Sequence, residues 1–386
     1  MAKKMKLAIV QSRITQFDEP LYKELFCRND FDFMVYYTIP LTQKNLIDPE
    51  IGELPSWHTT ESELYPSFRR GTGFIGGLSL LFKILTGRYD LVIISGYNSG
   101  LFLLIALACR ISGIPTGLRT DNVMLYRDQA HWKWRLKKFL YPLLLKIYST
   151  SHPTGSLAAA YLEHFGVSKN DIFYFPYNVD NKRLECLSVE SKPKQEIIRH
   201  SLGIKISDRI VLGILKFVQR EDPLTLFDGF ELISREHSDL HLILVGDGEL
   251  RKTLEDRINA KGMGNVHLVG YVQYADLPCY FGMADIFVHP GSGSWEVSVN
   301  EAMACGVPVI ASDHIGSAYD LIEPNKTGYI FQMGSPTSLA EKLRLVLEQA
   351  DFKGESLPHL KTKMAKWNYD QTINNLCAAL LYINSY

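Results

Sequence analysis

The sequence predicts an α/β protein of two domains, each built on a parallel sheet with helices on both faces. Its 386 residues, 46% of them hydrophobic, are enough to bury two sizeable cores. Short apolar strands alternate with helical segments along most of the chain, a rhythm typical of parallel sheets. Between about residues 175 and 205 a polar passage rich in Lys and Glu interrupts this rhythm. We therefore expect one domain before this passage and another after it.

In the first half, the hydrophobic pattern predicts a simple alternation of elements. The expected strands are 6–10, 31–38, 91–95 and 116–120, and the expected helices are 21–27, 101–112 and 132–148. The first apolar run is cut short at Gln11, so it is too short for a secretory signal. The longest apolar segment, 101–109, is too short to span a bilayer. We expect a cytoplasmic protein, or one attached to the inner face of the cell membrane.

The second half resumes the alternation. The expected strands are 210–215, 241–245, 266–269, 284–288 and 307–311. Asp222 and Pro223 favour the start of a helix, because proline suits the first helical turn. Gly306 should end a helix over 300–305. The expected domains are 1–178 and 179–365, followed by a last helical segment, 366–386.

Charge and cysteine content exclude several classes of protein. The net charge is −1, divided into +4 for residues 1–190 (22 Lys and Arg against 18 Asp and Glu) and −5 for the remainder (19 against 24). A nucleic-acid-binding domain would be far more basic. The six cysteines are scattered without a Cys-x-x-Cys pair, which favours reduced thiols in the cytosol over disulfides or a zinc site. No group of potential ligands has metal-binding spacing, so no metal is expected.

The most informative motif lies between Trp295 and Ser312. It predicts a loop, a short helix and then a buried β-branched strand. A carboxylate in the first turn of such a helix, here Glu301, is well placed to accept hydrogen bonds from sugar hydroxyls, because an ionised carboxylate offers only acceptors. The free N–H groups at the helix start can meanwhile receive an anion.

From Glu301 to Ser312 the chain reads Glu-Ala-Met-Ala-Cys-Gly-Val-Pro-Val-Ile-Ala-Ser. This run resembles the donor site of retaining GT-B glycosyltransferases of family 4 (glycosyl transferases group 1), and the likeness covers roughly residues 205–350. The resemblance implies the GT-B fold, in which two Rossmann-like domains face each other across a cleft. It implies an acceptor site in the first domain, a nucleotide-sugar site in the second, and a last helix that crosses back to the first.

The resemblance also implies roles in donor binding. Glu301 matches the family Glu that accepts hydrogen bonds from the donor ribose, and the alternative is a charge that stabilises the helix N-terminus. The other expected nucleotide contacts are the N–H groups of Val297, Ser298 and Val299, close backbone approach at Gly246, and base contacts from Tyr271 and Val272. Ser298 could equally be a simple N-terminal cap, and the others could be ordinary strand ends.

The chain departs from the family pattern where the family has its first Glu, eight residues before Glu301. Gly293 stands there and cannot contact the transferred sugar. Three interpretations remain open. Glu296, at a position where the family usually has Gly, supplies a substitute carboxylate; the enzyme tolerates the loss; or the site is inactive. A negative charge beside a diphosphate is costly unless a cation or a sugar hydroxyl answers it.

A second departure concerns the donor phosphates, which need cations and backbone N–H groups. Lys216 matches the family's basic residue after the first strand of this domain. Glu221 stands where the family has a second Lys, and Arg220 beside it could reach the same phosphates. The alternative for Lys216 and Arg220 is a pair of solvated surface cations.

For the acceptor domain, the sequence offers fewer candidates. Many family members carry a His near the reacting centre, in the segment that corresponds to 117–122, and this chain has none there. Asp121 or Arg119 is the natural candidate, and the alternative is a strand-end turn with a cap. His289 is expected to be structural, since a lone His beside an apolar strand usually is.

Residues 131–141 interleave Lys and Arg with Trp, Phe and Leu. Such a helix can lie at an anionic membrane surface, where a lipid-linked acceptor would be presented. The alternative is a surface helix whose Trp and Leu side packs into the core of the domain.

These observations predict a hexosyltransferase that uses a nucleotide-diphosphate sugar as donor substrate and a glycan or lipid-linked glycan as acceptor. The resemblance implies retention of configuration, no metal or other cofactor, and a setting in surface-polysaccharide or lipopolysaccharide biosynthesis. One alternative is a catalytically impaired relative that acts as a nucleotide- or partner-binding scaffold, which Gly293 and Glu221 favour. Another is an inverting GT-B enzyme or a nucleotide-sugar epimerase; the epimerase should carry intact acid/base carboxylates and His in the cleft.

Overall fold

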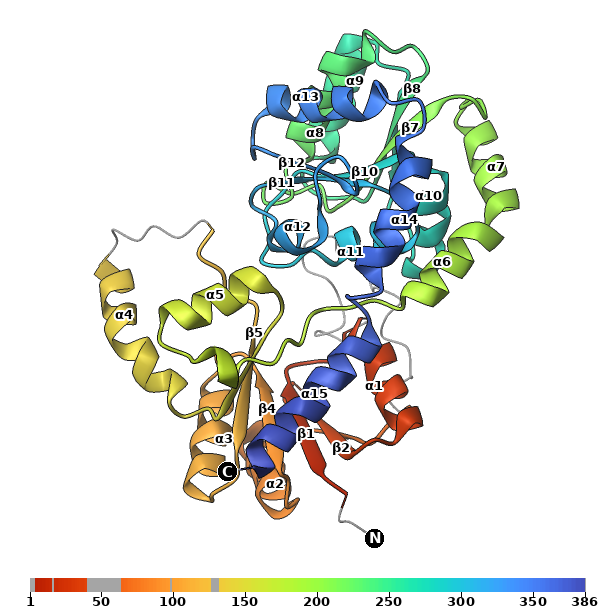
Figure 1. Ribbon diagram of the computed structural model, residues 1–386. Helices are drawn as coiled ribbons and strands as arrows, with labels where there is room; N and C mark the ends of the chain where they lie inside the picture. The colour runs from red at the N-terminus through yellow and green to blue at the C-terminus, as the bar shows by residue number, and fades with distance from the viewer. Residues whose placement is uncertain (1–3, 16, 40–63, 98, 126–131, 386) are drawn as a thin grey trace. The chain divides into compact units, whose positions relative to one another are not determined.

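The computed structural model describes residues 4–15, 17–39, 64–97, 99–125 and 132–385. The chain divides into two compact units. The first contains the described residues up to Asn178 together with those from Tyr369 onwards, and the second contains Val179–Asn368. Each unit is built on its own six-stranded parallel sheet with helices on both faces (Figure 1).

The sheet of the first unit has the strand order β3-β2-β1-β4-β5-β6. Its strands are β1 (Lys6–Gln11), β2 (Asp32–Tyr37), β3 (Ser67–Arg69), β4 (Leu91–Ser95), β5 (Thr116–Thr120) and β6 (Thr150–Pro153). Side chains of a strand alternate between the two faces of a sheet. Accordingly Ala8 and Val10 of β1 join one hydrophobic core, whereas Leu7 and Ile9 join the other.

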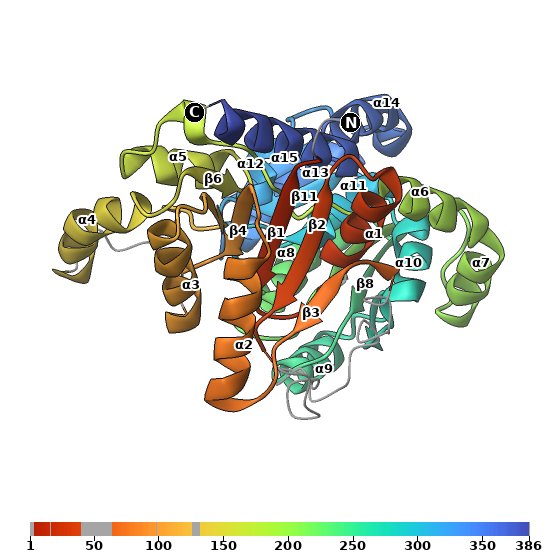
Figure 2. The same cartoon turned by 90° about the horizontal axis from the view of Figure 1, so that it is seen from below.

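Helices cover both faces of this sheet. One core includes side chains of α2 (Gly73–Thr86), α3 (Gly100–Ile111), α4 (Trp132–Leu145) and α5 (Ser156–His164). The opposite core includes side chains of α1 (Asp18–Arg28) and of the last helix, α15 (Tyr369–Asn384). A short 3₁₀ turn spans Lys169–Asp171. Figure 2 shows α2 and α3 on one side of the strands and α1 on the other.

The sheet of the second unit has the strand order β12-β11-β10-β7-β8-β9. Its strands are β7 (Arg209–Ile214), β8 (Leu240–Val245), β9 (Val266–Gly270), β10 (Ile286–His289), β11 (Val309–Ser312) and β12 (Gly328–Phe331). Its helices are α6 (Asn181–Glu190), α7 (Lys192–Ser201), α8 (Pro223–Ser234), α9 (Arg251–Lys261), α10 (Leu277–Met283), α11 (Val297–Ala304), α12 (Gly316–Leu321), α13 (Pro336–Leu347) and α14 (Phe352–Met364), with a 3₁₀ turn at Tyr274–Asp276.

Local sequence signals account for several helix ends in this unit. Asp222 caps α8, because its side chain accepts a hydrogen bond from the Thr225 N–H at 3.2 Å, and Pro223 occupies the first turn as expected. Gly306 ends the helix of the motif with φ of +75°, a left-handed conformation that glycine adopts without steric cost. These signals lie within a few residues of the ends that they determine.

The strands and helices expected from the sequence are present, and α/β with two parallel sheets is confirmed. The polar passage up to about residue 205, where the sequence predicts an interruption of the alternation, instead contains α6 and α7. The buried residue of α7 is Gln195, so the helix is polar overall and buries no apolar side chain that could mark it as part of a core. No helix in the part of the chain that the structure describes is long and apolar enough to cross a membrane.

Candidate functional site

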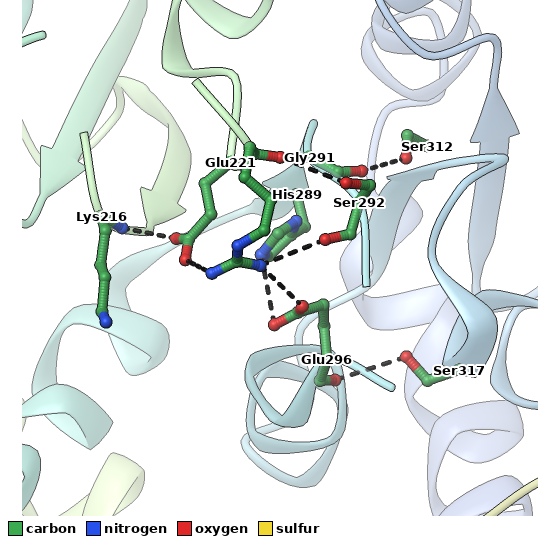
Figure 3. Close-up of polar contacts among 9 residues, drawn as sticks. Lys216, Glu221, His289, Gly291, Ser292, Glu296, Ser312 and Ser317 are labelled. Atoms are coloured by element: carbon green, nitrogen blue, oxygen red, sulfur yellow. Dashed lines mark hydrogen bonds and ion pairs between the residues drawn. The ribbon is translucent and has the colours of Figure 1, made fainter. Parts of the chain in front are cut away.

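The candidate site lies at the carboxyl ends of β7 and β10 in the second unit. These two strands are neighbours in the sheet, but the chain continues from β7 toward β8 and from β10 toward β11, on opposite sides. In open parallel sheets, ligands bind at such a switch point beyond the carboxyl ends of the strands. The loop after β7 carries Lys216 and Glu221, and the loop after β10 carries Gly291 and Glu296 (Figure 3).

Glu301 is a buried carboxylate with an unsatisfied oxygen. The helix α11 starts at Val297, so Glu301 lies in its second turn and not, as expected, in its first. Its side chain is 5% exposed, and Oε1 has no hydrogen-bond partner. Burial raises the pKa of this carboxyl to about 7, although a hydrogen bond from Tyr274 lowers it. Because the helix dipole acts mainly within the first turn, a purely dipolar role explains Glu301 poorly.

Glu296 occupies the space that a side chain at position 293 would need. A Cβ added to Gly293 would lie 1.9 Å from Glu296 Oε1. The same carboxylate approaches two further residues: Oε1 lies 3.5 Å from Arg220 Nη1, and Oε2 lies 3.8 Å from His289 Nε2. Burial, and then the charge of Glu221, raise the pKa of Glu296 to about 8. The glycine and the carboxylate are therefore spatially complementary.

Arg220 links the loops after β7 and β10. Its guanidinium pairs with Glu221, donates to the Ser292 carbonyl at 3.2 Å and approaches Glu296 (Figure 3). It is therefore not a freely solvated surface cation, and that alternative is wrong for Arg220. The interactions instead hold a positive charge between two carboxylates at the end of the sheet.

Glu221, which replaces the family's second Lys, organises the loop after β7. Its carboxylate accepts the backbone N–H of Lys216 at 2.5 Å and pairs with Arg220. In Figure 3 the Lys216 side chain extends away from this carboxylate. Glu221 thus supplies a structural link within the loop, in place of a second cation for phosphate.

His289 ends β10 and is buried below this cluster. Burial, and then the charge of Arg220, lower the pKa of its imidazole to about 4. The ring is therefore neutral near pH 7, so its 3.8 Å approach to Glu296 is not an ion pair at that pH. A neutral buried imidazole agrees with the structural role expected for this residue.

The start of α11 offers backbone donors. Glu296 is the N-cap residue, and it makes no side-chain capping bond. Ser298 lies inside the helix, so the cap interpretation for Ser298 is wrong. The N–H groups of Val297 and Ser298 belong to a first turn that has no intrahelical acceptors. The N–H of Val299 donates to the Glu296 carbonyl at 3.3 Å.

The backbone conformation requires glycine at position 246. Its φ is +142°, and a Cβ there would lie 1.9 Å from the Leu215 carbonyl oxygen. The protein's own backbone thus already requires glycine here, and close approach of a nucleotide at Gly246 stays a prediction. Tyr271 and Val272 directly follow β9 and lie at the same carboxyl edge of the sheet.

The two acceptor candidates lie in the first unit. Arg119 is buried in an ion pair with Asp18 at 2.9 Å, and its guanidinium stacks 3.9 Å from the centre of the Phe175 ring. Such burial argues against direct contact with an acceptor and corrects that expectation. Asp121 follows β5 at the carboxyl edge of the sheet. It lies close enough to Tyr177 that its negative charge, after burial, is the second cause that raises the pKa of the Tyr177 hydroxyl.

Helix α4 has one side in the core and one exposed side, and contact of residues 131–141 with a membrane stays a prediction. Trp134 and Tyr141 pack into the core, whereas Trp132 and Phe139 are exposed. His131 lies outside the described residues.

Sequence reasoning missed Tyr274, which lies in a separate 3₁₀ turn and forms a hydrogen bond with Glu301. No sequence spacing could have connected these two residues. In the described parts of the chain, no three His, Cys, Asp or Glu side chains converge as a metal site requires.

Comparison with known proteins gives a family match over the part of the chain that contains this candidate site. Residues 194–366 match the family model described as glycosyl transferases group 1. The chain is similar to spore coat protein SA of Bacillus subtilis, with 28% identity over 192 residues, 47% of this chain and 50% of that protein. It is also similar to the GDP-mannose-dependent monoacylated alpha-(1-6)-phosphatidylinositol monomannoside mannosyltransferase of Corynebacterium glutamicum, with 28% identity over 183 residues, 45% of this chain and 46% of that protein. The chain thus spans about half the length of these curated relatives.

Among solved structures, the chain is similar to HepE of Anabaena in complex with UDP. The TM-score is 0.74 and the identity 18%, over 97% of this chain and 99% of that chain. Two parallel-sheet units with this likeness define the class: the protein has the GT-B fold of glycosyltransferases. The match to the model described as glycosyl transferases group 1 covers most of the second unit, including the motif that begins at Glu301.

Proposed function

We propose that this protein transfers a hexose from a nucleotide-diphosphate sugar to a hydroxyl of a glycan or lipid-linked glycan, with retention of configuration. The observation that carries the proposal is Glu301, a carboxylate that is nearly fully buried and keeps Oε1 without a partner. A buried polar atom without a partner costs free energy. A hydroxyl of the donor ribose would remove that cost by donating to it.

The diphosphate would lie at the switch point between β7 and β10. Lys216, Arg220 and the first N–H groups of α11 would stabilise its negative charge, because preorganised cations and amides act strongly where water is excluded. The names of similar proteins favour a nucleotide donor of this kind: HepE is described in complex with UDP, and the Corynebacterium relative as GDP-mannose-dependent.

Among the three interpretations of Gly293, substitution by Glu296 has the best support. Glu296 Oε1 stands where the side chain of a family Glu would leave the backbone, and Arg220 answers its charge at 3.5 Å. We propose that Glu296 accepts a hydrogen bond from a hydroxyl of the transferred sugar. This role needs no proton transfer, so the raised pKa of Glu296 affects only the strength of the contact.

The transfer itself needs no protein base. The bond from the sugar C1 to the diphosphate oxygen breaks while the bond from C1 to the acceptor oxygen forms on the same face. The departing diphosphate oxygen takes the acceptor proton, so charge and protons balance without a metal. We further propose a setting in surface-polysaccharide or lipopolysaccharide biosynthesis, on the cytoplasmic side of the membrane.

A thermal-shift screen tests the proposal. The purified protein would be heated with UDP-, GDP-, ADP- and dTDP-sugars and with the free nucleotides, since a ligand that binds only the folded state raises its apparent stability. A shift with one nucleotide class that is lost in Glu301→Ala, followed by turnover of that sugar, would support the proposal. No shift with any donor at about millimolar concentration, well above usual Kd values, would favour the non-catalytic scaffold. The presence of Glu221 in place of the family's second Lys is the observation that favours this alternative.

A further inference from the structure

The first unit exposes an unusually apolar surface on two neighbouring helices. On α2, the side chains of Phe74, Ile75 and Phe82 are 79%, 81% and 68% exposed. On α3, Leu104, Leu107 and Ile111 are also exposed. We call this surface the α2–α3 face; it is defined by Phe74, Ile75, Leu78, Phe82, Leu104, Leu107 and Ile111.

The exposed residues form stripes on helices that are otherwise anchored in the core. On α2 the inward positions Gly76, Leu80 and Ile84 are buried, while Phe74, Leu78 and Phe82 recur every four residues on the outward side. The two helices pack on each other, and both views place them side by side on one face of the sheet (Figures 1 and 2). A surface helix that is apolar on both its inner and outer sides requires a second apolar environment.

The charges around this face are almost all positive. Between residues 64 and 115 there are five Lys and Arg and one acid, Asp90. Asp90 is engaged with the backbone, because its carboxylate accepts the Lys6 N–H at 2.7 Å. Arg69 and Arg70 precede α2, and Arg88 follows it. Cations at both ends of a helix with exposed Phe and Ile are the composition of helices that lie in the interface of an anionic bilayer.

We propose that the α2–α3 face docks this protein on an anionic lipid bilayer, with Phe74, Ile75 and Phe82 inserted among the lipids. The positive charge favours this occupant over a second copy of the chain, because a symmetric dimer through this face would bring like charges together. The surface is distinct from the helix that the sequence singled out for membrane contact, residues 131–141. The inference rests on this face alone and holds whatever sugar is transferred.

Vesicle sedimentation with the full chain tests the proposal. We expect binding to vesicles that contain about one third phosphatidylglycerol, weaker binding to phosphatidylcholine alone, and loss of affinity as salt rises. Phe74→Ser together with Ile75→Ser should lower the affinity for anionic vesicles about tenfold or more, because two inserted side chains are removed. Lys83→Gln together with Arg88→Gln should reduce the salt dependence.

Matched controls distinguish binding through the α2–α3 face from non-specific adsorption to vesicles and from effects on the donor site. Ile197→Ser with Ile206→Ser removes two equally exposed apolar side chains from the second unit and should leave vesicle binding unchanged. All variants should keep the thermal unfolding curve and the donor-induced shift of the parent. The proposal is overturned if the parent protein binds neither vesicle or if the Phe74 and Ile75 variant binds as the parent does. It is also overturned if sedimentation in solution shows a dimer that this variant dissociates.

Discussion

Glu296 Oε1 lies 1.9 Å from the point where a Cβ on Gly293 would stand, so both positions cannot carry a side chain in this conformation. The family pattern described above has Glu at the first of these positions and usually Gly at the second. This chain exchanges the two residue types and still holds a carboxylate beside Arg220, 3.5 Å from its Nη1. Our proposal that Glu296 substitutes for the family's first Glu rests on this spatial exchange.

The exchange can be reversed by mutation. Glu296→Gly alone should lower the turnover by about a hundredfold, the usual scale for removing one preorganised contact to the reacting group. Gly293→Glu combined with Glu296→Gly should restore part of that loss, since it returns a carboxylate to the same region. Steady-state kinetics with the donor identified by the thermal-shift screen provide the measurement.

A separate variant tests the position of Glu296 without changing its chemistry. Gly293→Ala should displace the Glu296 carboxylate, because a flexible side-chain end gives way more easily than backbone. Turnover should fall while the free energy of unfolding stays nearly unchanged. Glu341→Gln, which alters an exposed carboxylate on α13, is the matched control. Full activity in Gly293→Ala would show that Glu296 does not act from this place.

The free energy of unfolding should decrease as pH rises from about 5 to 8. The folded-state pKa of Glu301 is raised from 4.5 to about 7, and that of Glu296 from 4.5 to about 8. The native state therefore binds protons that the unfolded chain has already released, and its stability is fully present only below the unfolded-state pKa. Glu301→Gln should remove on the order of 2–3 kcal/mol of this pH dependence. Urea unfolding at a series of pH values measures it, and an unchanged slope in the variant would contradict the burial of this carboxylate.

Donor affinity should show the opposite pH trend. Hydroxyl donors on Glu301 favour its ionised form, so binding lowers its pKa and releases a proton. The nucleotide-sugar should therefore bind more tightly as pH rises through about 7. Calorimetry in buffers of different ionisation enthalpy counts the released proton. Proton uptake, or affinity independent of pH, would place the ribose away from Glu301.

The buried pair of Arg119 with Asp18 should stabilise the first unit. Asp18→Asn leaves the guanidinium without its counter-charge, which typically costs about 3–5 kcal/mol at a buried site. Adding Arg119→Met should recover part of that loss, because the uncompensated charge is removed. Chemical unfolding measures both variants. An Asp18→Asn protein as stable as the parent would show that the pair contributes nothing.

Gly246 should tolerate no side chain, even in the absence of nucleotide. Gly246→Ala places a Cβ 1.9 Å from the Leu215 carbonyl at a φ of +142°, so we expect a loss of about 2–4 kcal/mol in the free energy of unfolding. Gly264→Ala is the control, because an added Cβ there meets nothing within 4 Å. If both variants unfold alike, the glycine at 246 serves the ligand and not the fold.

The sequence alone determined the fold class and the place of the donor motif. The signals that predicted the elements act over a few residues, so they can be recognised in the sequence. They include the periodicity of strands and helices, the cap at Asp222 and the helix end at Gly306. The run from Glu301 to Ser312 likewise keeps its residues within one helix and one strand, so its family resemblance could indicate a candidate donor site from the sequence alone.

Only the tertiary structure decided which side chains meet. The contact of Arg220 with Glu296 joins residues 76 apart, and the pairing of Arg119 with Asp18 joins residues 101 apart. The sheet brings them together because the carboxyl ends of parallel strands share one edge. The sequence also did not show which residues are buried or crowded. Arg119 is buried in an ion pair with Asp18, and the Leu215 carbonyl leaves no room for a side chain at Gly246. Burial also leaves Glu301 Oε1 without a hydrogen-bond partner, since exclusion of solvent depends on every element packed around a residue.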